Sequence, residues 1–180
     1  MKKRITKVTT KTGDDGSTGM ADGTRLKKSD PIIHCIGEID ELNSLIGYLA
    51  SANDLKRHNE SLIRIQNCLF NIGGSLSLGS DDSITEQEIS FVEEEINLLN
   101  ADLSSLENFI LPGGHPTSAL AQLVRSVCRR CERSLVSLDE KQSIEDRKII
   151  YINRLSDLFF VMARSINKEK NCQEVFWQQT

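Results

Sequence analysis

The amino-acid sequence predicts an all-α protein, a five-helix bundle of the up-and-down type. Apolar residues recur at three- and four-residue intervals in five separate segments, which is the period of an amphipathic helix. The links between these segments are short, as in helical bundles. We find no strand-like alternation of apolar and polar residues, no internal repeat and no low-complexity segment. One composition over 180 residues indicates a single domain, with an N-terminal segment (1–29), a bundle (30–170) and a tail (171–180).

The first helix is expected from Asp30-Pro31 to about residue 52. Its second face is too apolar and too rich in small residues for plain exposure to solvent, and Asp40 projects from it. This pattern suggests a packing surface for another subunit, with Asp40 available to meet an arginine; a solvated acid is the alternative. The core stripe of this helix consists of Cys35, Ile39, Leu42, Ile46 and Leu49.

The second helix is expected over residues 55–78, and the third begins after Thr85. Gly73-Gly74 weakens the second helix, so we expect a neighbouring backbone to approach closely there. Thr85 and Glu88 form a capping-box pattern ahead of the third helix, in which residues 93–95 are three consecutive glutamates that we interpret as a solvated face. The two core stripes are Leu62, Ile65, Leu69, Ile72 and Leu76, and then Ile89, Val92, Ile96 and Leu99.

The fourth helix is the most distinctive segment, because it carries a row of arginines. It is expected to begin at Pro116, after a pair of glycines, and to end near residue 138. Arg125, Arg129 and Arg133 are spaced i, i+4, i+8 and share one line with Glu132, while Arg130 lies on the other flank of the apolar stripe. The stripe consists of Leu120, Leu123, Val124, Val127, Cys131, Leu135 and Leu138.

The row of arginines raises an electrostatic question. Two cations about 6 Å apart repel by about 2–3 kcal/mol at an effective dielectric constant near 20. Glu132 alone does not neutralise this many cations. The row is therefore either a solvated basic face or one side of a site that an anion completes.

The fifth helix is expected over residues 144–168, with a polar face at a second position around the helix. Asn153, Asp157, Phe160 and Arg164 share that face, where an Asn with an Asp one turn later suits contacts with a base, a ribose or an arginine, and surface polarity is the alternative. The tail at residues 175–177 is apolar enough to fold back onto the protein. The core stripe consists of Ile152, Leu155, Leu158, Phe159, Met162 and Ile166.

The N-terminal segment has the composition of an anion-binding loop. Residues 10–19 place glycines among hydroxyls and a lysine, so that backbone N–H groups can turn toward an anion. Asp14 and Asp15 are suited to a divalent cation that bridges phosphates. The segment is not a P-loop, because no GKS or GKT follows the glycines. A flexible tail is the alternative.

Charge and composition exclude several classes of function. The net charge of −4 argues against general binding of nucleic acids. We expect no contact with a membrane and a soluble, cytoplasmic protein, since no apolar run reaches about 20 residues and no signal-peptide core is present. Five scattered cysteines suit a reducing compartment, and Cys128 and Cys131 are interpreted as packing residues, with zinc or redox chemistry as the alternative. The three histidines share no ligand spacing, so no metal is assigned to His or Cys.

Four blocks together resemble the PduO-type ATP:corrinoid (cob(I)alamin) adenosyltransferases. They are residues 10–28 (TKTGDDGSTGMADGTRLKK), 37–47 (GEIDELNSLIG), 109–135 (FILPGGHPTSALAQLVRSVCRRCERSL) and 151–159 (YINRLSDLF). Any one block is weakly specific, whereas the order and spacing of all four span nearly the whole chain. Two positions depart from the usual pattern: Ile36 stands where the family has an aromatic residue, and Met20 replaces a leucine.

The resemblance implies a homotrimer whose active site lies between neighbouring subunits. The reaction transfers the 5′-deoxyadenosyl group of ATP to the cobalt of cob(I)alamin and releases triphosphate. By similarity, Arg125 would pair with Asp40 of the next subunit. Mg²⁺ would be held through the ATP phosphates, with Asp14 nearby. The residues implied in ATP binding are Thr10, Lys11, Thr12, Gly13, Thr18, Gly19, Lys28, Arg129, Arg130, Glu132, Arg133 and Asn153.

The resemblance also implies roles around the cobalt. Arg129, Glu132, Arg133 and Phe109 would form the catalytic set, and Phe109 would lie beneath the corrin and keep the lower axial ligand off the metal. The tail aromatics Phe176 and Trp177 are expected to contact cobalamin. A flavin-type reductase would supply the electron that converts cob(II)alamin to cob(I)alamin. A different interpretation is a non-catalytic helical module that binds a nucleotide or a partner helix.

Overall fold

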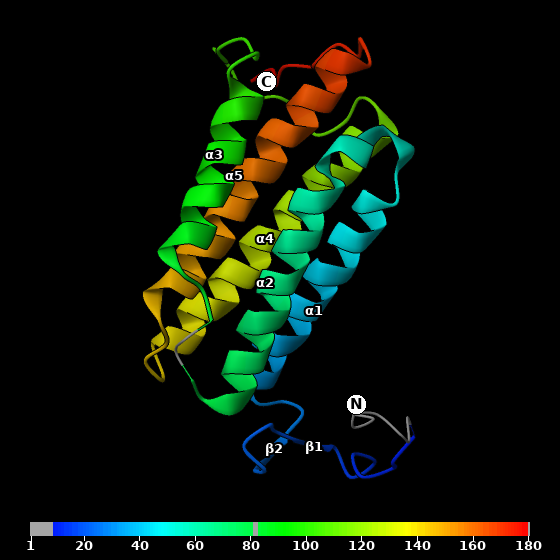
Figure 1. Ribbon diagram of the computed structural model, residues 1–180. Coiled ribbons are helices and arrows are strands. Elements are labelled where there is room, and N and C mark those ends of the chain that lie inside the picture. The colour runs from blue at the N-terminus through cyan, green and yellow to red at the C-terminus, as the bar shows by residue number, and fades with distance from the viewer. Residues whose placement is uncertain (1–8, 81–82, 180) are drawn as a thin grey trace.

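The structure, a computed structural model, describes residues 9–80 and 83–179 and contains the five expected helices. They are α1 (Pro31–Ala50), α2 (Asn59–Leu78), α3 (Glu86–Asn100), α4 (Pro116–Asp139) and α5 (Asp146–Glu169), as Figure 1 shows. A 3-10 helix, η1 (Asn53–His58), occupies the region where the sequence suggested that α2 would begin. The all-α bundle is therefore confirmed. None of the helices in the described ranges is long and apolar enough to span a membrane.

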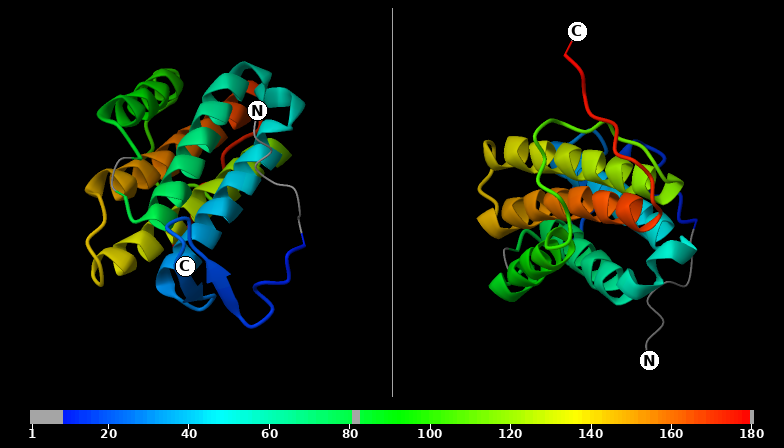
Figure 2. Two further views of the ribbon diagram at one scale, coloured as in Figure 1. Left: turned by 60° about the horizontal axis from the view of Figure 1, so that its bottom comes forward. Right: turned by 90° about the horizontal axis from the view of Figure 1, so that it is seen from above.

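Neighbouring helices pack in the pairs α2–α1, α1–α4, α4–α5 and α5–α3. An ion pair between Arg64 of α2 and Glu88 of α3 brings the two ends of this series together, and Figure 2 shows α2 and α3 side by side. The α4–α5 pair makes the most extensive contact, and α1 and α3 pack at its two edges. The helix α4 is therefore flanked on both sides, and its remaining outward face carries the arginine row.

The core consists of the predicted stripes. All five stripe residues of α1, all five of α2 and all six of α5 are buried. Ile96 and Leu99 of α3 and Leu120 of α4 are half-buried and pack against this core. Leu123 of α4 is the exposed member of its stripe, at 49%. At about 100° per residue, Leu123 lies 100° around the helix from the buried Val124, on the flank that also carries Arg130. Its inclusion in the stripe was wrong, because the stripe of α4 is narrower than its apolar residues suggested.

The helix ends are capped by short-range hydrogen bonds. Asp30 accepts from the amide of Ile32 at 3.1 Å, Thr85 accepts from the amide of Glu88, and His115 Nδ1 accepts from the amide of Thr117 at 3.3 Å. Each bond satisfies one of the free N–H groups of a first helical turn. The predicted cap at Thr85 is confirmed, and so is the start of α4 at Pro116.

The N-terminal segment contains a short β-hairpin that the sequence did not predict. Strand β1 (Ser17–Gly19) pairs with β2 (Arg25–Lys27) in antiparallel fashion, with Thr18 opposite Leu26. In the connecting turn, Asp22 accepts hydrogen bonds from both the amide and the hydroxyl of Thr24, at 2.8 and 2.7 Å. The expectation of a chain without strands is thus corrected; strands of three residues are too short to show a period of two.

The glycine pair of α2 does not have the neighbour that we expected. A Cβ added at Gly73 or Gly74 would meet no atom of this chain within 4 Å. The prediction of a close backbone approach is therefore wrong for the isolated protomer. Both glycines instead line an open groove between α1 and α2.

Candidate active site

The arginine row of α4 lies on the outward face of the bundle. Arg129 and Arg133 are exposed and Arg125 is half-buried. Arg125 Nε donates to Gln122 at 2.7 Å, and Arg133 Nη1 donates to the carbonyl of Arg129 at 2.9 Å. Within residues 9–80 and 83–179, no acidic side chain pairs with these three arginines. Burial, and then the charge of Arg129, lower the pKa of Arg125, as expected for cations that share a face.

Arg130 differs from the other arginines of α4 because it has acidic partners on α1. Its Nη2 donates to Glu41, and its Nε lies 3.9 Å from Glu38. The hydrogen bond to Glu41 raises the pKa of Arg130. In this chain Arg130 therefore joins α4 to α1, on the side of the arginine row that faces α1.

A polar network joins α4 to α5 and α3 on the other flank. Asn153 Nδ2 donates to Glu132 at 2.9 Å, and Arg154 Nη1 donates to Asn153 Oδ1 at 3.1 Å. Arg154 then forms an ion pair with Glu93 of α3 at 2.8 Å, so Glu93 is not the freely solvated acid that we expected. The structure thus brings together two predicted ATP ligands, Glu132 and Asn153, and fixes the amide of Asn153 from both sides.

The predicted ATP-binding segment folds back on itself in the hairpin. Lys28 Nζ donates a hydrogen bond to the carbonyl of Gly13 at 2.8 Å, and the hydroxyls of Thr10 and Thr12 are hydrogen-bonded to each other at 3.0 Å. A Cβ at Gly13 would lie 2.9 Å from the carbonyl oxygen of Ser17, so this close approach requires glycine. The predicted residues of the segment are exposed or half-buried, so their donors can reach an external ligand.

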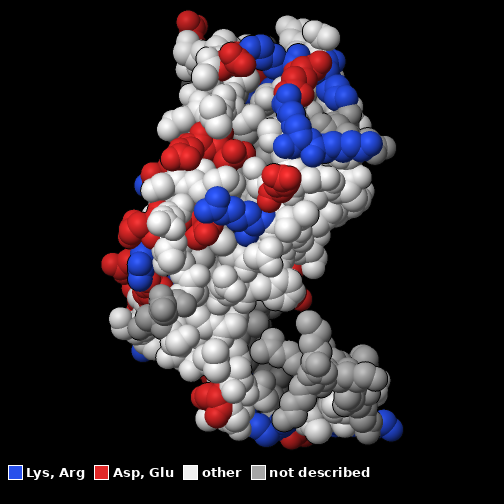
Figure 3. All heavy atoms as spheres, viewed as in Figure 1, with Lys and Arg blue, Asp and Glu red and all other residues white. Residues whose placement is uncertain are grey.

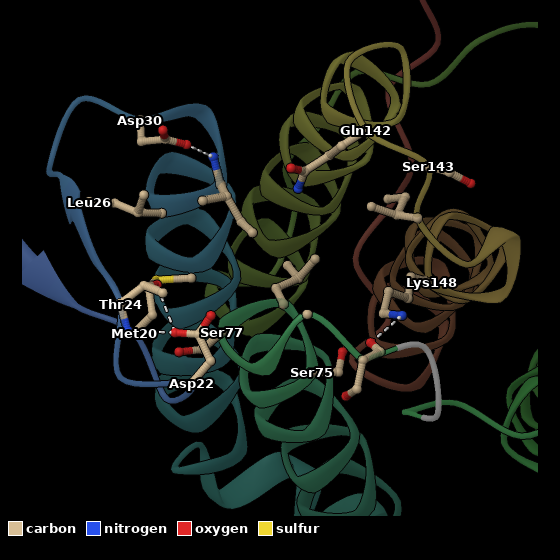
Figure 4. Close-up of a pocket in the computed structure, with 15 residues that line it drawn as sticks. Met20, Asp22, Thr24, Leu26, Asp30, Ser75, Ser77, Gln142, Ser143 and Lys148 are labelled. Carbon is tan, nitrogen blue, oxygen red and sulfur yellow. Dashed lines mark hydrogen bonds between the residues drawn. The ribbon is translucent and has the colours of Figure 1, made fainter.

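The other side of the hairpin closes a cavity of about 400 Å³ (Figure 4). The amide of Ala21 donates to the carbonyl and to the hydroxyl of Ser77, at 3.1 and 2.9 Å, and ties the hairpin to the end of α2. In this cavity the buried Lys148 donates to the carbonyl of Ser80 at 3.4 Å and forms an ion pair with Glu145 at 3.3 Å. The hairpin therefore packs against the bundle within this chain, and the cavity lies between them.

Phe109 lies at the other end of the bundle, beside the C-terminal tail. Its ring is 80% exposed and makes an edge-to-face contact with Trp177, with ring centroids 6.5 Å apart. A surface cavity of about 460 Å³ lies between these two rings and Phe160 of α5. Phe176 pairs with Ile110 in an isolated antiparallel bridge, which confirms that the tail folds back.

The exposed side of α1 forms a groove with α2 that has few charged residues. Ile33, Ile36 and Asp40 of α1 face Phe70 and the glycine pair of α2 across a volume of about 310 Å³. Phe70 is 70% exposed. Figure 3 shows acidic side chains gathered over α3, whereas much of the surface over α1 and α2 is uncharged. An apolar groove of this kind is typical of a surface that packs against another protein.

The predicted site residues do not meet within one protomer. The hairpin lies at the end of the bundle where α1 begins, while the connector between α3 and α4 and the C-terminal tail lie at the opposite end (Figure 1). Phe109 belongs to this connector and contacts Trp177 of the tail. The intervening helix α4 has 24 residues and is therefore about 36 Å long. Glu132 and Asn153 are together, as are Lys28 and Gly13, and Phe109 and Trp177, but the three groups are separate.

The buried cysteines have the character of packing residues. Cys35 Sγ donates to the carbonyl of Ser134 at 3.3 Å, and Cys131 Sγ donates to the carbonyl of Glu38 at 3.1 Å. Burial raises the pKa of Cys35 to about 11 and that of Cys131 to about 12, so both thiols are neutral near pH 7. In the described ranges no three His, Cys, Asp or Glu side chains form a metal-binding group.

Two residues near the tail were not recognised as important from the sequence. Arg164 was placed on an outer polar face, but it is 5% exposed and forms an ion pair with Glu174 at 2.9 Å. Asn167 is also buried. Its side chain accepts a hydrogen bond from the amide of His115 and donates one to the carbonyl of Gly113. The spacing of Arg164 and Asn167, three residues apart on the last turns of a mostly apolar helix, was the available signal.

Comparisons with known proteins identify the family of this chain. The profile of the cobalamin adenosyltransferase family matches residues 8–166. A cobalamin adenosyltransferase of Cupriavidus metallidurans is 41% identical over 99% of this chain and 98% of its own length. A corrinoid adenosyltransferase of Bacillus subtilis is 36% identical over 97% of this chain and 93% of its own length.

Solved structures show the same fold. A phenylalanine-to-alanine variant of a PduO-type ATP:corrinoid adenosyltransferase from Lactobacillus reuteri, complexed with cobalamin and ATP, is 33% identical and has a TM-score of 0.90. It covers 96% of this chain and 100% of its own. An arginine-to-lysine variant from the same organism, complexed with ATP, is 32% identical with a TM-score of 0.87, covering 95% of this chain and 100% of its own. This chain therefore belongs to the cobalamin adenosyltransferase family.

Proposed function

We propose that this protein transfers the 5′-deoxyadenosyl group of ATP to the cobalt of cob(I)alamin, giving adenosylcobalamin and triphosphate. Membership of the family supports this reaction, and so do the complexes of its structural neighbours with cobalamin and ATP. The observation that carries the proposal is the arginine row of α4, whose cations Arg125, Arg129 and Arg133 lack acidic partners in the described chain. A polyphosphate is the ligand that such a row accommodates.

The reaction is a nucleophilic substitution at C5′ of ATP. The electron pair of Co(I) forms the cobalt–carbon bond, and the electron pair of the broken C5′–O bond leaves with the triphosphate. No proton is transferred in this step, so no general acid or base is needed. The work of the protein is to hold cobalt and C5′ in line and to stabilise the charge of the leaving group.

The triphosphate would lie between Arg129 and Arg133 on one side and the N-terminal hairpin on the other. Lys28 and the backbone of Gly13 already contact each other, so a cation and a turn of backbone N–H groups are presented together. Glu132 and Asn153 are fixed by their mutual hydrogen bond and would orient the nucleoside. Thr10, Lys11, Thr12, Thr18 and Gly19 would complete the ATP site from the hairpin, and Arg130 from the flank of α4.

We place this site between subunits of a homotrimer. Because the hairpin and Phe109 lie at opposite ends of one protomer, a hairpin from a neighbouring copy is needed to bring both to one ligand. The groove between α1 and α2 offers an apolar surface for assembly, and Asp40 on its rim would pair with Arg125 of the neighbour. That pair would neutralise the arginine that is most buried in the row.

Mg²⁺ would accompany ATP. The described chain offers no cage of three ligands, but Asp14 is an exposed carboxylate in the hairpin segment. One carboxylate together with phosphate oxygens is a typical set for Mg²⁺, which keeps several waters. The ion would neutralise phosphate charge alongside Lys28.

Phe109 would form the wall beneath the corrin, with Phe176 and Trp177 beside it. An apolar wall excludes a fifth ligand from cob(II)alamin, and the four-coordinate ion is easier to reduce, so that a flavin-type reductase can supply the electron. The exposed ring of Phe109 and its contact with Trp177 support this role, because both rings are open to a large ligand. The five free cysteines of this chain, four of them buried, support a cytoplasmic location.

The test is an anaerobic assay that follows the absorbance of cob(I)alamin after ATP is added, with chromatography of the corrinoid and phosphate products. We expect stoichiometric adenosylcobalamin and intact triphosphate. If folded protein binds ATP but no cobalt–carbon bond forms, the alternative of a non-catalytic nucleotide- or partner-binding module stands.

A second experiment tests the role of Phe109. Phe109→Ala is assayed with cob(II)alamin plus a weak reductant and, separately, with pre-reduced cob(I)alamin. It should lose more activity in the first assay, and equal losses would contradict the proposed wall.

A further inference from the structure

The backbone around Phe109 is held by the C-terminal tail. The carbonyl of Phe109 accepts a hydrogen bond from the amide of Trp177 at 2.7 Å. Two residues on, the amide of Leu111 donates to the carbonyl of Val175 at 2.8 Å. These two bonds flank the bridge between Ile110 and Phe176, so the tail adds a short strand to the connector that presents Phe109.

The tail itself is fastened to α5 by one ion pair. Glu174 accepts two hydrogen bonds from Arg164, from Nε at 2.9 Å and from Nη2 at 3.3 Å. The same Nη2 also donates to the carbonyl of Ser104, at 2.9 Å, in the connector between α3 and α4. Arg164 thus holds the tail and the connector to one point of α5.

The ion pair is an important anchor, because the rest of the tail buries little surface. Val175 is 61% exposed, and Phe176 and Trp177 are each 48% exposed. Arg164, by contrast, is 5% exposed, so the loss of its carboxylate partner would leave an uncompensated buried charge. A two-point contact between a guanidinium and a carboxylate also fixes direction, which a single apolar contact does not.

We propose that Glu174 is a positioning residue, which through Arg164 fastens the tail so that Phe109 and Trp177 together form the wall for the corrinoid. The ligand in this statement rests on the proposed function. The bridge between Ile110 and Phe176 sets which residues of the connector and the tail are opposite each other, and so it brings the rings of Phe109 and Trp177 into contact. Glu174 itself lies in the cavity beside Arg164 and not in the one lined by Phe109 and Trp177.

The start of α4 should remain in place when the tail is released. Asn167 bonds the amide of His115 at 2.9 Å and the carbonyl of Gly113 at 3.0 Å, and it does so from α5 without using the tail. Loss of Glu174 is therefore expected to act on the corrinoid wall and to spare the arginine row. This separation allows a specific test.

The experiment compares Glu174→Gln with wild type and with Gln178→Ala, a change at an exposed tail position. Trp177 is the single tryptophan, so its quenching by acrylamide reports the tail directly. We expect stronger quenching and roughly ten-fold faster hydrogen exchange at the amides of Leu111 and Trp177 in Glu174→Gln, the factor that about 1.4 kcal/mol makes in an equilibrium. The half-saturating corrinoid concentration should rise by a similar factor, with that of ATP unchanged.

A double variant checks the route of the effect. If Glu174 acts through Phe109, then Glu174→Gln should cost little further activity in a Phe109→Ala background. If Glu174→Gln does not fold, Arg164→Gln with Glu174→Gln removes both charges together and replaces it in every measurement.

Unchanged exchange at Leu111, equal rises for ATP and corrinoid, or losses that multiply in the double variant would each overturn the proposal. If the wild type makes no adenosylcobalamin, the proposed function fails. The exchange and quenching measurements then still decide whether Glu174 holds Phe109.

Discussion

Alanine at position 114 would place a methyl group where Asn167 already lies. The added Cβ would be 2.3 Å from Oδ1, 2.6 Å from Nδ2 and 2.7 Å from Cγ of Asn167. Gly114 also has a φ of 93°, which costs a residue with a side chain about 1–2 kcal/mol. The side chain of Asn167 would have to move, with loss of its bonds to His115 and Gly113, at about 1 kcal/mol each. We expect Gly114→Ala to lower the free energy of unfolding by about 3–4 kcal/mol in total.

The assay is unfolding by guanidinium chloride together with thermal melting. For a protein of this size, the loss corresponds to roughly 6–16 °C in Tm. Gly37→Ala is the matched control, because its Cβ meets no atom within 4 Å and Gly37 lies inside α1, where alanine is favoured. Asn167→Ala removes the side chain that the added methyl group at position 114 would meet. The double variant should therefore lose less free energy of unfolding than the two single variants lose together. A Gly114→Ala protein within 1 kcal/mol of wild type, about the spread of ordinary substitutions, would refute this reasoning.

Four further predictions follow from the site and from the core. Arg129→Ala should reduce the rate of adenosylation by about 100-fold, as for loss of one charge-stabilising donor. Because the side chain is exposed, Tm should change by less than about 3 °C. A large loss of Tm together with the loss of rate would argue against contact between Arg129 and the ligand. Asp40→Ala should loosen the proposed trimer in sedimentation experiments, and an unchanged assembly would exclude the proposed pair with Arg125. Gly73→Ala should stabilise α2 by up to about 1 kcal/mol in the protomer yet weaken assembly at the groove, as seen by comparing unfolding with sedimentation. Burial raises the pKa of Cys35 and Cys131 from 9.0 to about 11 and about 12, so the folded state binds these protons more tightly than the unfolded state. The stabilisation is complete below pH 9 and is lost as the pH rises toward 11–12, which unfolding measured at pH 8, 9 and 10 will show as a decline.

The sequence predicted the parts of the fold that depend on local period. The stripes of α1, α2 and α5 are buried as expected, because a residue such as Ile39 or Leu155 shares its face with others within one or two turns. Caps such as Thr85 were also predictable, since donor and acceptor lie three residues apart. Leu123 shows the limit, because periodicity does not say how wide a buried stripe is.

Contacts between distant residues were not predictable from one sequence. The ion pairs of Arg130 with Glu41 and of Arg154 with Glu93 depend on which helices are neighbours, and spacing does not contain this information. Arg164 was placed on an outer face because its partner, Glu174, lies beyond the end of the helix. The resemblance to the family supplied the candidate ligands, whereas their separation into three groups became visible once the chain was folded.

The placement of the hairpin and Phe109 at opposite ends of the bundle has a consequence for mixtures of defective chains. Suppose that one variant lacks a working hairpin and another lacks the phenylalanine; each alone should be inactive in the cob(II)alamin assay. When the two are unfolded together and reassembled at equal amounts, about a quarter of the junctions in the proposed trimer should combine an intact hairpin from one chain with an intact aromatic wall from the next. Recovery of activity in this mixture would show that two inactive variants complement each other, with each junction using the hairpin of one copy and the phenylalanine of the next.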